Sequence, residues 1–373
     1  MAGRAELSEP GPARTPTPKL RSRSGGAAVA LDDLDRRLLN LMQGSFPIAP
    51  RPYREVARLA GTEGFGEREA MERTARLLEQ RIIRQVTPIF DTRALGYSSM
   101  LVAAKVDPAH PHRAAGVINA HPGVSHNYLR NHEFNLWFTI ATEPDSRLGL
   151  DGTLEVLARE SGATSVRQLP TLRLFKIRMD LEMEGDTQAL ASPTAASEPV
   201  ELGAQPYDEW DIAVIRALQG DMPVIEEPFA PAAAALGVSQ ERLLQHLEGM
   251  RERGLLRRVA AILFHRRAGF SANGMGVWKV PEERILDEGK RMAAVRGISH
   301  CYQRPTYEDW PYSVFTMAHG RSKEECDAIL DSIATDTGVT ERATLYSSTE
   351  FKKIRLLYFT EEHRNWERQH AGV

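Results

Sequence analysis

Two short segments of the sequence place a histidine, a tyrosine and an arginine at alternate positions. The first contains His126, Tyr128 and Arg130, and the second contains His300, Tyr302 and Arg304. On a β-strand, residues i, i+2 and i+4 share one face, so the three side chains of each set would point together. An imidazole can donate a proton near neutral pH, and a guanidinium binds a carboxylate through two parallel hydrogen bonds. Each set therefore combines a proton donor, a phenol and a carboxylate clamp.

Each residue type also has a plainer interpretation. A histidine at a strand edge often faces solvent, a tyrosine often closes the margin of a core, and a surface arginine usually pairs with a carboxylate. Because the same three types recur in register in both sets, we predict that both histidines are catalytic and that both arginines bind substrate. The two tyrosines are candidate catalytic residues for which the core alternative stays open.

Arg51 and Tyr53 are candidate substrate-binding residues in a turn that prolines bracket. The alternative is a helix start with proline in the first turn. The second half of the chain has Glu227 and Phe229 in the corresponding places, so the charge is lost there. This difference predicts that the two halves are not equivalent sites.

The last strands of both halves end in lysines, namely Lys176, Lys352 and Lys353. We take Lys176 and Lys352 as candidate substrate-binding residues, with lysines that protect an edge strand from pairing as the alternative.

His132 and His265 are also candidate substrate-binding residues. Their alternatives are a surface loop for His132 and a charged connector for His265.

The chain is a tandem duplication, with a first and a second copy of one unit. Five blocks recur in the same order: Asp35–Gly44 and Asp211–Gly220, Arg81–Val86 and Arg253–Val259, Leu95–Ser98 and Ala268–Ser271, His126–Arg130 and His300–Arg304, and Leu174–Ile177 and Phe351–Ile354. Differences in spacing fall between the blocks, as divergence after duplication would give. Both copies are therefore expected to have the same fold.

Hydrophobic spacing predicts the elements of the first copy. Helical spacing over 31–42, a helix that begins at Pro52 and a helix over 67–80 predict three helices, and 81–90 is typical of a β-wing. From Tyr97 the order strand, helix, strand, strand, helix, strand predicts a ferredoxin-like sandwich. The expected fold class is α+β, a tandem repeat of a winged helix-turn-helix and a ferredoxin-like (β-α-β-β-α-β) sandwich domain.

Domain boundaries follow from these patterns and from a stretch rich in Ala, Ser, Pro, Thr and Glu between the copies. The expected segments are a disordered tail 1–30, a winged helix-turn-helix 31–92, a ferredoxin-like domain 93–182, a linker 183–206, a second winged helix-turn-helix 207–265, a second ferredoxin-like domain 266–360 and a tail 361–373.

Composition limits the function classes. A net charge of −3 argues weakly against a dedicated nucleic-acid-binding protein. The two cysteines, Cys301 and Cys326, form neither a disulfide framework nor a zinc motif, so no metal site is expected. No apolar run reaches the ~18 residues that span a membrane, and residues 1–30 lack the apolar core of a secretory signal. We expect a cytoplasmic protein without membrane contact.

The predicted fold resembles the Lrp/AsnC transcription regulators, which assemble through their sandwich domains. One branch of that superfamily carries the blocks Phe46–Tyr53, His126–Phe138, Leu174–Ile177, His300–Pro305, Trp310–Phe315 and Phe351–Ile354. By these blocks the chain resembles the siroheme decarboxylases, with the two subunit types fused. The resemblance covers about 31–182 and 207–360. The regulators usually have a Gly-Asp-Tyr-Asp-like turn where this chain has His132-Glu-Phe-Asn135.

The resemblance implies a carboxy-lyase that removes carbon dioxide from two acetate side chains of siroheme. The product would be 12,18-didecarboxysiroheme, on the route to heme d1 or to heme by an alternative pathway. It implies no required cofactor, because the iron belongs to the substrate. A pyrrole acetate can lose carbon dioxide once the electron-rich ring is protonated, which suits a histidine as the general acid. The copies are expected to pair within one chain; a further homo-oligomer and the identity of the productive half stay open.

Two other functions remain as alternatives, a transcription regulator of the Lrp/AsnC type and a non-catalytic heme-binding protein. The third predicted helix, 67–80, carries four glutamates against three arginines, and its counterpart 239–253 carries three of each. Phosphate contacts dominate DNA affinity, and neutral or acidic helices supply few of them. We therefore expect no specific DNA binding.

Overall fold

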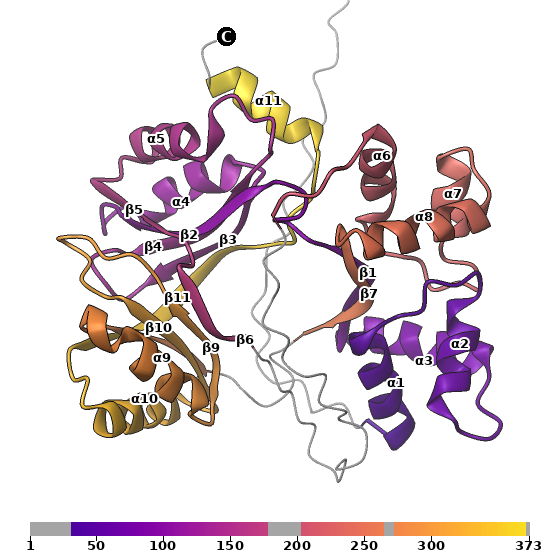
Figure 1. Ribbon diagram of the computed structural model, residues 1–373, viewed down its shortest axis with the longest axis horizontal. Coiled ribbons are helices and arrows are strands. Elements are labelled where there is room, and N and C mark those ends of the chain that lie inside the picture. The colour runs from indigo at the N-terminus through magenta and orange to yellow at the C-terminus, as the bar shows by residue number, and fades with distance from the viewer. Residues whose placement is uncertain (1–30, 178–202, 265–271, 371–373) are drawn as a thin grey trace, which may run out of the picture. The chain divides into compact units, whose positions relative to one another are not determined.

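The computed structural model describes residues 31–177, 203–264 and 272–370, which belong to one compact unit (Figure 1). The predicted tail 1–30, most of the predicted linker and His265 lie outside the described residues. Within the described ranges, no helix is both long enough and apolar enough to cross a membrane.

Each copy begins with three helices and a strand. These are α1 (Asp33–Gly44), α2 (Pro52–Ala60), α3 (Glu67–Glu79) and β1 (Ile83–Phe90) in the first copy, and α6 (Glu209–Leu218), α7 (Ala230–Ala235), α8 (Gln240–Glu252) and β7 (Leu256–Leu263) in the second. The duplication extends to the helix starts. The Asp32 carboxylate accepts from the Asp35 backbone N–H at 2.7 Å, and Asp208 caps Asp211 in the same way at 2.9 Å. Both are capping boxes, which satisfy donors that a helix start leaves unpaired.

The segment predicted as a β-wing forms a single strand in each copy. β1 pairs antiparallel with β7, so that Val86 lies opposite Ala261 and Pro88 lies opposite Val259 (Figure 1). A wing made of two strands from one copy does not form among the described residues. Each strand instead satisfies its backbone groups against its counterpart, because one copy supplies only one strand at this place.

The remaining elements of each copy follow the predicted β-α-β-β-α-β order. The first copy has β2 (Ser98–Lys105), α4 (Pro111–Ala120), β3 (Val124–Arg130), β4 (Leu136–Thr142), α5 (Gly149–Ser161), β5 (Ser165–Leu169) and an added β6 (Arg173–Ile177). The second has β8 (Ala272–Trp278), the 3₁₀ helix η2 (Glu282–Arg284), α9 (Ile285–Ala294), β9 (Ile298–Gln303), β10 (Val314–Gly320), α10 (Lys323–Thr337) and β11 (Arg342–Lys353). The tandem α+β fold class is thus confirmed.

The two copies exchange their final strands. The hydrogen-bonded order of the described strands is β5-β2-β4-β3-β11-β8-β10-β9-β6. The first part of β11 pairs with β8 of its own copy, and its last part pairs with β3 of the first copy. In return, β6 of the first copy pairs with β9 of the second. The predicted pairing of the two halves is therefore present within one chain (Figure 1).

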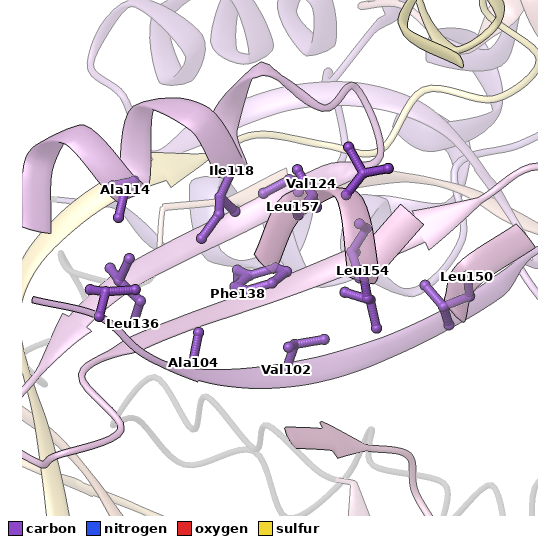
Figure 2. Close-up of a cluster of buried hydrophobic side chains, with 14 of the residues drawn as sticks. Val102, Ala104, Ala114, Ile118, Val124, Leu136, Phe138, Leu150, Leu154 and Leu157 are labelled. Carbon is purple, nitrogen blue, oxygen red and sulfur yellow. The ribbon is translucent and has the colours of Figure 1, made fainter. Parts of the chain in front are cut away.

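Three apolar clusters hold the sandwich domains together. In the first copy, side chains of α4 and α5 pack on β2, β3 and β4, as Figure 2 shows for Ile118, Leu154 and Phe138. The second copy has the equivalent cluster beneath α9 and α10. A third cluster, which we call the inter-copy core, joins the helix-free faces of the two copies; it contains Ala103, Phe134, Trp137, Leu169, Met275, Val277, Trp310, Phe315 and Leu345.

The segment 361–373, predicted as a tail, contains instead the helix α11 (Glu361–His370). Trp366 is only 6% exposed and joins the core of the first copy, where its ring meets His121 edge-on at 4.4 Å. The Glu367 carboxylate accepts from the Ser146 hydroxyl at 2.6 Å. A segment that is otherwise mostly charged and polar thus docks through Trp366, the buried ring of His363 and the Glu367 carboxylate.

Candidate functional site

The first His-Tyr-Arg set lies on the face of β3 that points away from the helices. The residues between its members face the other way, since Asn127 donates to Asn119 of α4 at 3.0 Å and Leu129 packs against the helix-side core. The rings of His126 and Tyr128 lie 6.2 Å apart with planes tilted by 29°. The Arg130 guanidinium lies 5.9 Å from the Tyr128 ring centre. The three side chains share one face, as the alternation predicts.

The second set repeats this geometry on β9. Cys301 points into the helix-side core of the second copy, so its neighbours face the opposite side. The rings of His300 and Tyr302 lie 6.0 Å apart with an interplanar angle of 28°. The Arg304 guanidinium lies 5.0 Å from the Tyr302 ring centre.

Both arginines reach across to the other copy. Arg130 Nη1 donates to the Leu345 carbonyl at 3.1 Å, and Arg304 Nη1 donates to the Leu169 carbonyl. Burial lowers the pKa of each guanidinium to about 10. The Nε atom of each is buried and has no hydrogen-bond partner among the described residues. An orphaned buried donor is costly, so each arginine can bind an incoming carboxylate favourably.

Both histidines bond to the hydroxyl of the preceding serine. His126 Nδ1 lies 3.0 Å from Ser125 Oγ, and His300 Nδ1 lies 2.6 Å from Ser299 Oγ. Burial lowers the pKa of both imidazoles below the ordinary value. For His126, the positive charges of Lys353 and Arg84 lower the pKa further. The lowered pKa of each imidazole favours its neutral form in the protein without substrate.

Two of the predicted substrate-binding lysines face the helices instead. Lys352 Nζ donates to the carbonyls of Asn119 and His121, at 2.7 and 3.2 Å, and so caps the end of α4. Lys176 lies opposite Cys301, a residue of the helix-side core. Lys352 is thus engaged with α4, and the register gives Lys176 the same side, so substrate binding by either lysine stays a prediction. Lys353 lies opposite His126. Strand alternation alone does not show which lysine shares the face of His126. The pairing register of β11 with β3 is also needed.

Arg51 and Tyr53 are engaged within the helix-turn-helix pair. The Arg51 guanidinium binds Glu67 at 2.6 Å and Glu226 at 2.9 Å, which joins the first copy to the second. Tyr53 is 1% exposed, and its ring packs edge-on against Phe46 at 5.1 Å. Tyr53 thus lies on the buried face of α2 and packs in the core, and its role in substrate binding stays a prediction.

His132 borders the inter-copy core. Its Nδ1 accepts from the Phe134 backbone N–H at 3.1 Å, and its ring meets Trp310 of the second copy at 5.2 Å. Burial lowers the pKa of His132. The turn after β3 thus helps to join the copies. His265 lies outside the described residues.

Comparisons with known proteins agree with this arrangement. The family described as the siroheme decarboxylase NirDL-like HTH domain matches residues 35–84 and 211–257, and the AsnC-like ligand binding domain matches residues 94–176 and 267–352. The siroheme decarboxylase of Hydrogenobacter thermophilus is 38% identical over 330 residues, which cover 88% of this chain and 96% of that protein. The chain belongs to the siroheme decarboxylase family.

Solved structures and separate subunits of the siroheme decarboxylase family also match. The crystal structure of the siroheme decarboxylase NirDL is 34% identical, with a TM-score of 0.74, and covers 91% of this chain and 99% of that chain. A second crystal structure of NirDL, in complex with an iron-uroporphyrin III analogue, also has a TM-score of 0.74. The siroheme decarboxylase beta subunit of Methanosarcina barkeri is 38% identical over 146 residues, which cover 39% of this chain and 96% of the subunit.

Proposed function

We propose that this chain removes carbon dioxide from two acetate side chains of siroheme. The observation that carries the proposal is the pair of His-Tyr-Arg faces, each of which brings a histidine, a phenol and a buried guanidinium together. They occur in a chain that a siroheme decarboxylase matches over most of its length. The iron arrives as part of the substrate, and no other cofactor takes part.

The arginines and a histidine have different roles in the proposed decarboxylation. The buried Nε donors of Arg130 and Arg304, to which the described part of the chain supplies no partner, bind substrate carboxylates. A histidine protonates the electron-rich ring that bears the acetate. The electron pair of the bond to the carboxyl carbon then moves into the protonated ring, and carbon dioxide leaves. The side-chain carbon takes up a proton to become a methyl group, while the ring returns its proton, so each decarboxylation consumes one proton in net.

The charges of the helix-turn-helix units support an enzyme over a transcription regulator. Arg73 and Arg76 of α3 both bind the Asp35 carboxylate of α1. At the corresponding place in the second copy, Arg253 binds Asp211 at 2.6 Å. Arginines held by carboxylates of their own domain have little charge left for DNA phosphates. We propose that these units serve assembly and the substrate site and do not bind specific DNA.

One experiment separates the enzyme from the alternatives. The protein is incubated anaerobically with siroheme, and the tetrapyrrole is analysed by mass spectrometry. Loss of two carbon dioxide units supports the decarboxylase, whereas bound but unchanged siroheme supports a heme-binding protein. Titration against a selected-site DNA library is the companion measurement. A sequence-selective complex tighter than about micromolar, with no turnover, would support the regulator.

A further inference from the structure

The end of β11 brings a lysine to the face of β3 that carries His126. Lys353 lies directly opposite His126, and the next residue, Ile354, donates its backbone N–H to the Ser125 carbonyl at 2.8 Å. Residues directly opposite one another in adjacent strands share a face. Lys352 points to α4, so the alternation directs Lys353 to the face of His126. The side chain of Lys353 is exposed, in contrast to that of Lys352.

Strand β1 of the first helix-turn-helix unit lies beside the end of β11. Arg355, two residues beyond Lys353, donates to the Thr87 hydroxyl and the Pro88 carbonyl of β1. It also donates to the Gln219 carbonyl at the end of α6, at 2.9 Å. The hydrogen bonds of Arg355 therefore hold β1 beside the end of β11. Arg84 stands on β1 just before this contact, close enough for its charge to act on His126.

We infer that Lys353 and Arg84 form a carboxylate-binding pair beside His126, so that the helix-turn-helix strand β1 is part of the substrate site. The inference rests on the proposed function, because siroheme is rich in carboxylates and needs several cationic partners. The two cations come from different elements, so they can hold two different carboxylates of one tetrapyrrole. The sequence places Lys353 among the lysines that end the last strands, but neither Lys353 nor Arg84 is among the substrate-binding residues predicted from it.

The pair also links substrate binding to protonation. The groups that surround His126 are Lys353 and Glu350 of β11, Arg84 of β1, Ser125 and Tyr128 of β3, and Thr139 of β4. Two positive charges against one negative charge favour a neutral imidazole in the free protein. Bound carboxylates neutralise the cations, so His126 takes up a proton as substrate binds. The general acid is then charged when its substrate is in place.

The test compares Lys353→Met and Arg84→Met with Lys290→Met, which removes an exposed lysine on α9. Iron uroporphyrin and siroheme are titrated anaerobically by absorbance, and proton uptake is followed with an indicator dye in weak buffer. We expect roughly tenfold or greater loss of affinity in each site variant, because charge-assisted hydrogen bonds are lost. The number of protons taken up on binding should also fall. Removal of either cation raises the pKa of His126, so that more of it is already protonated in the protein without substrate. Lys353→Arg and Arg84→Lys should restore both readouts.

The outcomes separate the inference from the proposed function. If the wild-type protein decarboxylates siroheme while both site variants match Lys290→Met in affinity and proton uptake, the inference is wrong and the function stands. If the wild-type protein neither binds nor converts siroheme, the proposed function is wrong and the inference falls with it. Circular dichroism and thermal unfolding confirm that each variant is folded before it is titrated.

Discussion

Arg130 of the first copy donates a hydrogen bond to the carbonyl of Leu345 in the second copy, at 3.1 Å. Arg304 makes the reciprocal contact with Leu169 of the first copy. Each arginine also lies against the tyrosine of its own set. The contacts that join the two copies therefore border both His-Tyr-Arg faces, so the side chains proposed to bind substrate also take part in assembly.

Replacement of Arg130 should affect both roles. Arg130→Met leaves the Leu345 carbonyl without its donor, which should lower the free energy of unfolding by about 1–3 kcal/mol. Siroheme affinity should fall as well, because a carboxylate partner is lost. Urea unfolding and absorbance titration measure the two effects. Arg159→Met, at an exposed position on α5, is the control. Unchanged stability would exclude Arg130 from the contact between the copies.

The two histidines should not contribute equally to catalysis. Because Lys353 and Arg84 stand beside His126, we expect His126→Ala to lower decarboxylation by about 10²–10⁴-fold, the usual contribution of a general acid. His300→Ala should cost clearly less. Anaerobic turnover of folded protein, with the singly decarboxylated product quantified, is the measurement. Near wild-type turnover in both variants would remove both histidines from the mechanism and direct the search to His132.

His121 should make stability depend on pH. Burial, assisted by the charges of His363 and Lys352, lowers the pKa of His121 to about 3 from 6.5. Its Nδ1 accepts from the Gly123 backbone N–H at 3.0 Å, so the folded protein requires the neutral ring. The unfolded chain binds the proton more tightly. The stability from this group is therefore complete above about pH 6.5 and falls toward pH 3, by about 1.4 kcal/mol per pH unit.

The measurement is the free energy of unfolding at several pH values between about 7.5 and 5. His121→Gln should flatten the slope, whereas His112→Gln, at an exposed position on α4, should not change it. An identical slope in the wild-type protein and His121→Gln would contradict this assignment.

Gly289 makes room for the exchanged strand β6. A Cβ atom at this position would lie 2.3 Å from the Phe175 ring, which packs into the core of the second copy. Gly289→Ala should therefore destabilise the protein by about 1–3 kcal/mol, as overpacked cores do. Gly116 in α4 has open space, so Gly116→Ala should stabilise by about 0.5–1 kcal/mol. Thermal unfolding of both variants tests the contrast, and equal shifts would show that Phe175 moves aside freely.

Much of the architecture was predictable because it is encoded locally. The capping boxes at Asp32 and Asp208, the apolar periods and the repeated blocks all depend on residues close in sequence. The common face of His126, Tyr128 and Arg130 follows from strand alternation alone. These features needed no knowledge of which segments meet.

The features that were missed depend on distant partners. Nothing near β1 indicates that its partner is β7, and a bulge between Glu350 and Lys352 sets which lysine meets His126. α11 carries a single buried tryptophan, Trp366, among charged residues, so its periodicity gave no signal. A register or a docking surface is a property of two segments, and one segment's pattern cannot specify it.

The exchange of β6 and β11 changes the reaction order of assembly. Relatives named as the alpha and beta subunits of siroheme decarboxylase are separate chains, and separate chains pair at a rate set by their concentrations. In this chain the pairing is unimolecular, because both partners share one backbone. Dilution cannot separate them, and every molecule contains one His-Tyr-Arg face from each copy. Since each copy completes the other's sheet, neither can lose its strands without exposing an unpaired edge on its neighbour.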